Sequence, residues 1–353
     1  MADWTGIGRY TRGLVSGLLQ LAEVEDLQLT LVVAPHQRHF SERRSPLQLV
    51  TAGKPPLSLG GLREIARTAR DVSPDVLHCT HISTPRPATP VPLVTTIHDL
   101  TPLVVEDSMP SAARRRVYRS LNARAVKRSA ALIVPSQATA GDVATYFPPS
   151  AEKLHVIPEA ADDFISAAKQ LMPEFIEKLP PAPFFLSMGN TKPHKNLPVL
   201  LEAFSRLDSD AQLLLVGAGE SAYLDAHLTG PARERIFFTG RVSDDELRWL
   251  YAHALAFVFP SRYEGFGLPP LEAAGFGAPV LAADASSLPE VMGDGALYFD
   301  ASDAAGLAQH LTCCLHEPEL LEALSAAATE RAHHFSWLDT ARATLAVYRR
   351  LMD

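Results

Sequence analysis

The sequence predicts an α/β protein with two doubly wound domains. Short apolar runs rich in β-branched residues alternate with helix-like stretches along the chain, which is typical of parallel sheets covered by helices. The 353 residues, with 47% apolar content, exceed what one ordinary core accommodates and indicate two domains of roughly 150–180 residues each. Residues 158–183 are rich in proline and form the natural linker between them.

The apolar runs place the strands. In the first half we expect strands at Leu29–Ala34, Val76–Cys79, Leu93–Ile97, Ala131–Pro135 and Leu154–Ile157. In the second half we expect them at Phe184–Met188, Gln212–Val216, Ile236–Thr239, Ala256–Phe259 and Pro279–Ala282. Ligands on such sheets bind beyond the carboxyl ends of the strands, so two facing units would form a cleft.

The start of the chain departs from this pattern. A doubly wound domain normally opens with a strand followed by a glycine-rich turn, but the segment Thr5–Tyr10, with Gly6 and Gly8, comes directly after Met-Ala-Asp-Trp. We therefore expect that the first strand is missing, that the amino-terminal sheet has a gap, and that the two glycines lie in a loop.

Composition excludes several classes of protein. A formal charge of −8 argues against nucleic acid as the main partner. Cysteine is rare, and Cys313 and Cys314 are adjacent, a spacing that seldom gives a structural disulfide, so a reducing cytoplasm is expected. The apolar runs are shorter than the roughly 18–20 residues of a membrane span, so any membrane association is expected to be peripheral.

The most informative segment is 256–284, which holds Glu264 and Glu272 on either side of a Gly-Phe-Gly-Leu-Pro-Pro turn. It predicts a buried strand, a glycine loop and a helix with Pro269 or Pro270 in its first turn. The unpaired amides of such a helix start attract an anion, most readily a phosphate. Glu272, expected in the first turn, would accept hydrogen bonds from a ribose diol. A solvated glutamate beside an ordinary turn is the alternative.

Two further loops follow strands of the second half. Residues 189–196 carry Lys195 at the end of the first strand, a suitable place for a pyrophosphate cation. Residues 217–222 match the G-x-G-x-x-A dinucleotide fingerprint and suggest a nicotinamide or flavin oxidoreductase. That class requires an acidic residue at the end of the next strand, where this chain has Gly240-Arg241-Val242, so the sequence argues against it. Main-chain groups around Val242 could hold a nucleobase, and a simple turn explains them equally well.

Histidines and arginines mark the first half. His98 ends a buried strand and is followed by Asp99, and a core histidine explains this as well as a site residue does. The cluster at residues 78–81 offers two imidazoles and a thiol that cannot all converge on one metal ion. A helical stretch without acidic residues contains Arg114, Arg115, Arg116, Arg119, Arg124, Lys127 and Arg128, with Val117, Leu121, Ala125 and Val126 expected on its inner face. Contact of residues 114–128 with anionic lipid and simple solvation of the helix both stay open.

Together these segments resemble a known family. Residues 261–273 resemble the E-x7-E signature of the group 1, family-4 retaining glycosyltransferases, which have the two-domain GT-B fold. The resemblance extends over segments 5–10, 98–99, 134–136, 156–158, 189–196, 216–220, 239–247 and 335–337. It implies an amino-terminal acceptor-side domain of residues 1–170 completed by the terminal helix 336–353, and a nucleotide-sugar-binding domain of residues 171–335.

The resemblance also assigns roles. It implies that Glu272 binds the nucleotide ribose, that Glu264 contacts the transferred sugar, and that the amides of Phe266, Gly267 and Leu268 hold sugar or diphosphate oxygens. Lys195 should neutralise the leaving diphosphate, and His98 should lie against the sugar. Gly6 and Gly8 should line the cleft. Asn190 stands where many relatives have an arginine, so one of the usual diphosphate cations is missing.

The form of the lysine loop resembles that of mannosyltransferases of polysaccharide assembly. GDP-mannose is therefore the preferred donor, with a UDP-sugar as the alternative, and the acceptor is expected to be a glycan or a lipid-linked glycan. The resemblance implies retention of anomeric configuration without a cofactor or metal. We expect a cytoplasmic enzyme, with contact at the inner face of the membrane left open. Three classes remain: a glycosyltransferase, a nicotinamide-dependent oxidoreductase, and a non-catalytic sugar-nucleotide binder.

Overall fold

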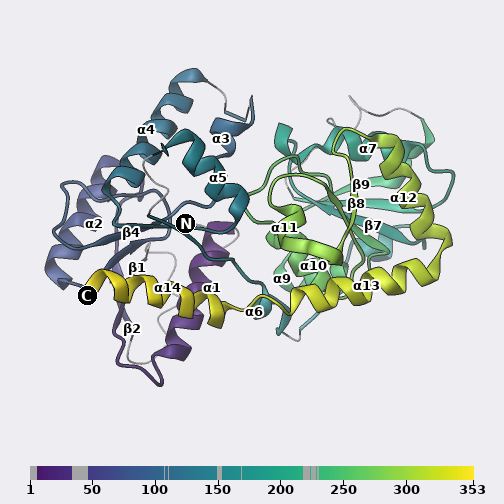
Figure 1. Cartoon of the computed structure of the whole chain (residues 1–353). Coiled ribbons are helices and arrows are strands. Elements are labelled where there is room, and N and C mark those ends of the chain that lie inside the picture. The colour runs from purple at the N-terminus through teal and green to yellow at the C-terminus, as the bar shows by residue number, and fades with distance from the viewer. Residues whose placement is uncertain are drawn as a thin grey trace. The chain divides into compact units, whose positions relative to one another are not determined.

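The computed structural model describes residues 6–33, 47–106, 108–109, 111–148, 153–167, 169–217, 223, 228 and 230–353. The chain divides into two compact units (Figure 1). Unit 1 comprises residues 1–104, 109–160 and 336–353, and unit 2 comprises residues 105–108 and 161–335. The family resemblance placed the boundary at residue 170; the short helix α6 (Asp162–Ile165) packs against α10 (Leu268–Gly275), and residues 161–170 belong to unit 2.

Unit 1 holds two parallel sheets among its described residues. One pairs β1 (Leu29–Val33) with β2 (Leu47–Thr51). The other has the order β3-β4-β5-β6, with β3 at Leu77–Cys79, β4 at Leu93–Thr96, β5 at Ala131–Val134 and β6 at Leu154–Val156. The helices are α1 (Gly6–Leu21), α2 (Leu59–Val72), α3 (Thr101–Val104), α4 (Ala112–Arg128), α5 (Gln137–Tyr146) and α14 (Trp337–Met352). The expected missing strand concerns a segment outside the described residues and stays a prediction.

The terminal helix α14 covers Trp337–Met352, within the expected range 336–353, and it crosses α1 and packs against it (Figure 1). Two glycines of α1 permit this close approach. A Cβ on Gly13 would lie 2.0 Å from the Trp337 ring, and one on Gly17 would lie 2.3 Å from the Trp337 carbonyl oxygen. A larger residue at either position would push the two helices apart, so these glycines join the two ends of the chain into one unit.

Unit 2 is a six-stranded parallel sheet in the order β12-β11-β10-β7-β8-β9. Its strands are β7 (Phe184–Met188), β8 (Gln212–Val216), β9 (Ile236–Gly240), β10 (Ala256–Phe259), β11 (Val280–Ala283) and β12 (Leu297–Phe299). Its longer helices are α7 (Leu197–Ser205), α9 (Asp244–His253), α10 (Leu268–Gly275), α11 (Leu288–Met292), α12 (Ala304–His316) and α13 (Pro318–Ala332). Short 3₁₀ turns cover Ile176–Lys178, Pro193–Lys195, Pro231–Arg235 and Gly293–Gly295.

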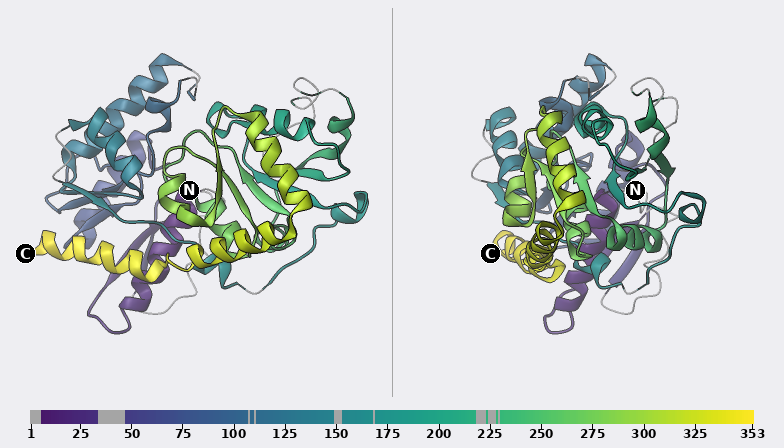
Figure 2. Two further views of the ribbon diagram at one scale, coloured as in Figure 1. Left: turned by 45° about the vertical axis from the view of Figure 1, so that its right-hand side comes forward. Right: turned by 90° about the vertical axis from the view of Figure 1, so that its right-hand side faces the viewer.

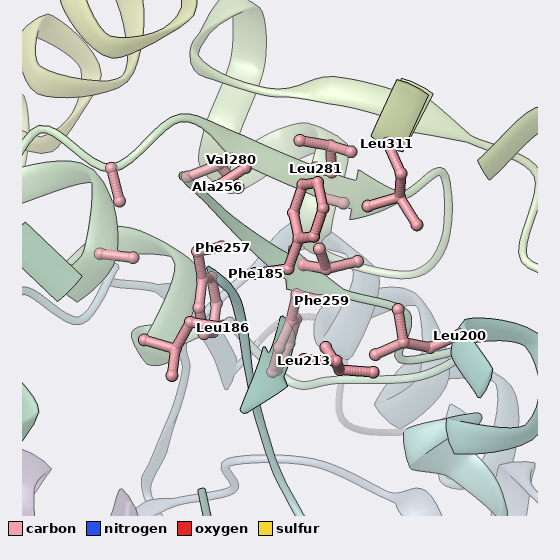
Figure 3. Packing of buried hydrophobic residues seen from close by; sticks show 14 of the residues in the cluster. Phe185, Leu186, Leu200, Leu213, Ala256, Phe257, Phe259, Val280, Leu281 and Leu311 are labelled. Atoms are coloured by element: carbon pink, nitrogen blue, oxygen red, sulfur yellow. The ribbon is translucent and has the colours of Figure 1, made fainter. Parts of the chain in front are cut away.

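Helices lie on both sides of this sheet (Figure 2). Helix α7 packs against α12, and α10 packs against α9 and α13. The core between them takes side chains from the central strands together with Leu200 of α7 and Leu311 of α12 (Figure 3). The strands are buried along their whole length at β8, β10 and β11, which is why their sequences read as continuous apolar runs.

Most predicted strands are confirmed, and those at β7, β8 and β10 have the predicted bounds. Strands β2 and β12 were not predicted. Each lies at one end of its sheet and is only partly buried; polar residues interrupt the apolar pattern of β2, and β12 is only three residues long. The loop predicted around Gly6 and Gly8 is wrong, because both residues belong to the first turn of α1. Val117 is also misplaced by the sequence: it is 59% exposed on α4, whereas Asn122, Ala125 and Val126 are buried.

Candidate active site

The candidate site lies at the carboxyl ends of the unit 2 strands. Strand β7 is first in sequence within this sheet, and its neighbours are β8 on one side and β10 on the other. The chain therefore winds away from β7 in opposite directions, and the loops after β7 and β10 border the point where the direction changes. Such switch points leave a crevice in which ligands bind on doubly wound sheets. Lys195 follows β7 and Glu264 follows β10.

A 3₁₀ turn and one asparagine hold the lysine loop. Lys195 ends the turn Pro193–Lys195, and Asn196 follows in the left-handed conformation with φ of 55°. The buried Asn196 amide nitrogen donates to the carbonyls of Pro260, at 3.0 Å, and Ala301, at 2.7 Å. Because these carbonyls follow β10 and β12, one side chain ties three strand ends together. Asparagine suits this position because it tolerates a positive φ and offers two donors.

Lys195 and Glu264 are in direct contact. The Lys195 ammonium nitrogen lies 2.6 Å from Glu264 Oε1, and the two side chains are 19% and 18% exposed. The ammonium also lies 5.2 Å from the centre of the Phe259 ring. The Arg262 amide donates to the His194 carbonyl at 2.8 Å and joins the two loops through their main chains. The structure thus brings together two residues that are 69 positions apart in sequence.

The loop after Glu264 turns at Gly267 into α10. Gly267 has φ of 113°, and a Cβ there would lie 2.9 Å from Leu288 Cδ2, so both backbone and space require glycine. The helix begins at Leu268, and Pro269 and Pro270 occupy its first turn, as the sequence predicts. Proline carries no N–H. The donors at this helix start are therefore the amides of Gly267 and Leu268, next to the Phe266 amide.

Glu272 does not lie in the first turn, contrary to the sequence prediction. The helix starts one residue earlier than the prolines suggested, so Glu272 belongs to the second turn and is only 2% exposed. The hydroxyl of the buried Tyr251 on α9 donates to Glu272 Oε2 at 3.2 Å. A solvated glutamate, the alternative left open by the sequence, is therefore excluded. A carboxylate taken out of water must be hydrogen-bonded, and Tyr251 meets part of that need.

Ser286 and Ser287 hold the Glu264 loop, and neither residue was identified from the sequence. Ser286 has φ of 57°, and its hydroxyl accepts from the Glu264 amide at 3.1 Å and donates to the Glu264 carbonyl at 2.5 Å. The Ser287 hydroxyl lies 2.7 Å from the Phe266 carbonyl. Both serines follow β11, so the only available signal was their position after the next strand of the sheet.

The remaining predicted donor residues lie around the same strand ends. The Asn190 side-chain oxygen accepts from the Lys192 amide at 3.0 Å and shapes the start of the lysine loop. Val242 follows β9 and packs against the unit 2 core. A small cavity of about 20 Å³ is lined by Ser187, Gly189, Asn190, Lys195, Phe238 and Pro260.

The backbone of this unit requires glycine at position 217, so its presence is explained without a bound dinucleotide. Gly217 has φ of 128°, and a Cβ there would lie 2.1 Å from the Gly189 carbonyl oxygen. Its amide donates to the Gly240 carbonyl at 3.0 Å. Only glycine allows the loops after β7, β8 and β9 to approach this closely. The remainder of the fingerprint, residues 218–222, lies outside the described residues.

In unit 1, His98 is held at both ring nitrogens. Nδ1 lies 2.9 Å from Glu159 Oε1, and Nε2 lies 3.0 Å from the Thr80 carbonyl oxygen. Tyr10 packs edge to face on the ring, with 4.7 Å between ring centres. Burial by itself lowers the pKa of His98, but the hydrogen bond and charge of Glu159, the Thr80 carbonyl and the charge of Asp99 together outweigh burial and raise it. Gly6 and Gly8 begin the same helix that carries Tyr10.

The histidine cluster of residues 78–81 is part of the unit 1 interior. His78 Nδ1 lies 2.5 Å from the Tyr348 hydroxyl of α14, and Nε2 lies 2.8 Å from Thr96 Oγ1. Burial and the nearby charge of His98 lower the pKa of His78 to about 3 and that of His81 to about 4. Within the described part of the chain, no group of three His, Cys, Asp or Glu side chains is placed to hold a metal ion. No described helix is both long and apolar enough to cross a membrane.

Comparison with known proteins agrees with this geometry. The family model for glycosyl transferases group 1 matches residues 169–331, and the model for glycosyltransferase family 4 matches residues 4–163. The chain is 28% identical to O-antigen chain mannosyltransferase B of Escherichia coli over 370 aligned residues, covering 98% of this chain and 96% of that protein.

Solved structures show the same fold. Sucrose-phosphate synthase from Thermosynechococcus elongatus superposes with a TM-score of 0.78 at 20% identity, covering 98% of this chain and 94% of that one. HepE from Anabaena, solved in complex with UDP-glucose, gives a TM-score of 0.67 at 18% identity and covers 96% of this chain and 95% of its own. The two family models and the mannosyltransferase relative favour a glycosyltransferase over an oxidoreductase or a non-catalytic binder. The chain belongs to the group 1, family-4 glycosyltransferases and has their GT-B fold.

Proposed function

We propose that this glycosyltransferase is a retaining mannosyltransferase that moves mannose from GDP-mannose to a glycan or lipid-linked acceptor. The contact between Lys195 and Glu264 at the switch point of the unit 2 sheet carries the proposal. A cation and a carboxylate lie side by side there, which supports a site for a diphosphate and for sugar hydroxyls. The name of the full-length E. coli relative, a mannosyltransferase, supports the choice of sugar. Retention of configuration is carried over from the family resemblance.

The proposed donor site uses the groups described above. Lys195 and the amides of Phe266, Gly267 and Leu268 bind the diphosphate and neighbouring sugar oxygens. Glu272 accepts from the ribose hydroxyls, a role carried over from the family resemblance, and Tyr251 holds the carboxylate through its hydrogen bond of 3.2 Å to Oε2. Asn190 lies beside the diphosphate, and Val242 beside the nucleobase. The family resemblance assigns His98 to the transferred sugar and Gly6 and Gly8 to the donor, and all three residues belong to unit 1.

The proposed chemistry is leaving-group stabilisation. Breaking the anomeric bond puts negative charge on the diphosphate, and donors already fixed in place stabilise that charge without reorganising. One such donor lowers the barrier by about 3–4 kcal/mol. Lys195 supplies a full positive charge, and Gly267 and Leu268 supply oriented amides at a helix start. The acceptor hydroxyl then attacks from the face that the leaving group vacates.

A panel of sugar nucleotides tests the donor. GDP-mannose, GDP-glucose, UDP-mannose and UDP-glucose separate the contribution of the base from that of the sugar. A ligand at 100 times its dissociation constant stabilises the folded protein by about 2.7 kcal/mol, so the donor should raise the melting temperature most. We expect GDP-mannose to do so, and NMR of the transfer product to show the α-configuration of the donor. Greater stabilisation by UDP-glucose would reassign the donor, and an inverted product would refute retention.

We also propose that α4 contacts anionic lipid. The helix has no acidic residue, and Arg114, Arg116, Arg119, Lys127 and Arg128 are exposed. Arg115 and Arg124 instead donate to main-chain carbonyls, at Leu103 and Pro85 respectively. Val117, 59% exposed among these cations, would add apolar contact. Each basic residue near an anionic surface contributes about 1 kcal/mol at low salt.

Flotation with lipid vesicles tests this contact. The protein should bind vesicles of phosphatidylglycerol but not of phosphatidylcholine. Replacing Arg116, Arg119 and Lys127 with serine should abolish binding, and raising the salt concentration should weaken it. The matched control replaces Arg63, Arg67 and Arg70 on α2, a helix that also carries Glu64 and Asp71. Equal loss of binding in both triple variants would refute a specific role for α4.

A further inference from the structure

We propose that Glu159 is a positioning residue that holds His98 as an imidazolium, and that sugar transfer depends on this charged form of His98. The protonation of His98 is inferred from the structure alone, and only the dependence of sugar transfer on it rests on the proposed function. Neither the sequence patterns nor the resemblance singled out Glu159, which comes three residues after β6 in the segment Val156-Ile157-Pro158-Glu159.

The His98 ring is fixed from three sides. Thr80 follows β3, Glu159 follows β6, and Tyr10 belongs to α1. The Thr80 hydroxyl in turn accepts from Thr11 of α1 at 3.0 Å, which holds the Thr80 segment against the helix. The side chains of His98 and Glu159 are 12% and 6% exposed. Bulk water therefore contributes little to the protonation of this pair, and the protein contacts decide it.

Hydrogen-bond chemistry restricts the ring to two states. A carbonyl oxygen cannot donate, so Nε2, at 3.0 Å from the Thr80 carbonyl, must carry a hydrogen. Nδ1, at 2.9 Å from Glu159 Oε1, then either donates to a carboxylate or accepts from a carboxylic acid. A free glutamic acid is more acidic than an imidazolium by about two pKa units. The shared proton therefore belongs on the imidazole, and the contact is a charge-assisted hydrogen bond.

The other titratable groups around the ring leave this assignment in place. Asp99 is adjacent in sequence and raises the pKa of His98 further. His78 and His81, on β3 and the segment after it, have lowered pKa values and are neutral near pH 7. Burial raises the pKa of Tyr10 far above its usual value, so it is a neutral phenol. Glu159 and Asp99 are the charged groups that face the imidazolium.

This arrangement decides what His98 can do. Both ring nitrogens are engaged as donors, so the ring cannot accept a proton from an acceptor hydroxyl. It acts instead as a fixed positive charge held in one orientation. Loss of the Nδ1 proton at high pH would point a nitrogen lone pair at the Glu159 carboxylate, and the ring would have to leave one of its two partners. Transfer should therefore decline when the pH rises through the pKa of the pair.

NMR of the free protein tests the pairing without any donor. In protein labelled with ¹⁵N in the histidine rings, and with the His98 signals assigned by their loss in His98→Gln, both ring nitrogens should have imidazolium shifts at pH 7.5. Glu159→Gln should convert His98 to the neutral tautomer with the hydrogen on Nε2, since the glutamine amide can donate to Nδ1. A neutral His98 in the unchanged protein would overturn the proposal.

The pH dependence of transfer tests the catalytic half. In Glu159→Gln the alkaline limb of kcat should move to lower pH by at least about one unit, with kcat about tenfold lower at pH 8 and donor KM within about twofold. Activity of this variant should recover toward that of the unchanged enzyme at pH 6, where the ring is protonated again. A residue with a merely structural role would not be rescued by pH.

Two further variants complete the experiment. Glu159→Ala removes the partner altogether and should not recover at low pH, because the ring is no longer oriented. Glu202→Gln is the matched control at an exposed glutamate of α7 and should leave the profile unchanged. An unchanged pH profile in Glu159→Gln would overturn the inference. An imidazolium found in a protein that transfers no sugar would overturn the proposed function and leave the pairing intact.

Discussion

The ion pair of unit 2 and that of unit 1 differ in how completely their donors are used. The Lys195 ammonium has three N–H donors, and Glu264 is its carboxylate partner at 2.6 Å. The His98 ring has two nitrogens, and both are engaged, by Glu159 and by Thr80. Lys195 has more N–H donors than its contact with Glu264 uses, and its side chain is 19% exposed, so it can bind a diphosphate. A ring with none to spare keeps its orientation. On the proposed function, the same kind of pair would serve ligand binding in unit 2 and fixed geometry in unit 1.

The largest expected effect breaks the unit 2 pair at its cation. Lys195→Ala removes the charge that is proposed to stabilise the leaving diphosphate, and kcat should fall by about 10²–10³-fold. Circular dichroism and melting temperature should change little, because the Lys195 side chain is 19% exposed and the loop is held by Asn196. A loss of less than threefold in steady-state transfer would remove Lys195 from the active site. Lys192→Ala, in the same loop, is the matched control.

Lowering the pH should destabilise the protein through the buried histidines of unit 1. His78 and His81 have folded-state pKa values of about 3 and about 4, whereas both should titrate near 6.5 when unfolded. Between these values the unfolded chain binds more protons, so stability falls as the pH falls below 6.5, by up to about 2.7 kcal/mol per pH unit for the two groups together.

His98 has the opposite sign. Its pKa is raised, so its stabilising contribution is complete below pH 6.5 and is lost as the pH rises through its folded pKa. Urea unfolding at a series of pH values should therefore give maximal stability close to pH 6.5. Replacing His78 with glutamine, which can still bond Tyr348 and Thr96, should reduce the acid slope by about half. An unchanged slope would mean that His78 is protonated in the folded protein.

Substitutions of the two glutamates of unit 2 should separate a contact that a ligand can replace, at Glu264, from one that stays in place, at Glu272. Glu264→Gln releases Lys195, so affinity for free nucleoside diphosphate should stay the same or rise by about threefold while kcat falls. Glu272→Ala should weaken nucleoside diphosphate binding by about tenfold or more, because the ribose is bound equally in ground and transition states. Isothermal titration of the diphosphate into both variants checks this, and the reverse order of affinities would refute the assignment.

The smallest effect concerns Tyr251, which fixes Glu272 as Glu159 fixes His98. Tyr251→Phe keeps the ring in the core, where it packs against Phe257 and Phe276, and removes only the hydroxyl. One hydrogen bond to a charged group contributes about 1.5–3 kcal/mol, and at 3.2 Å this bond is expected at the low end of that range, roughly tenfold or less in nucleotide affinity. We expect a rise in Kd of about threefold to tenfold, with kcat at saturating donor nearly unchanged. A fall in kcat with constant Kd would show that Tyr251 does not act through Glu272.

Local sequence was enough to predict much of unit 2. Strands β7, β8 and β10 have the predicted bounds because a strand buried on both faces is a continuous apolar run. The turn at Gly267 and the helix start at Leu268 followed from glycine and proline chemistry over a few residues. Strand β2 is interrupted by polar residues and β12 is only three residues long, so neither was recognised. Val117 fitted an apolar pattern but points into solvent on α4, since hydrophobicity alone does not say which side of a helix meets the core.

The residue pairs of the candidate site required the tertiary structure. Glu159 contacts His98 across 61 positions, Tyr251 contacts Glu272 across 21, and Asn196 contacts Ala301 across 105. Nothing in the local sequence marks Glu159, Tyr251 or Ala301 as partners of site residues. The sequence by itself determined which loops follow which strands and hence the family of the chain. Only the fold decided which side chains meet, because parallel strands bring their carboxyl ends together from segments far apart along the chain.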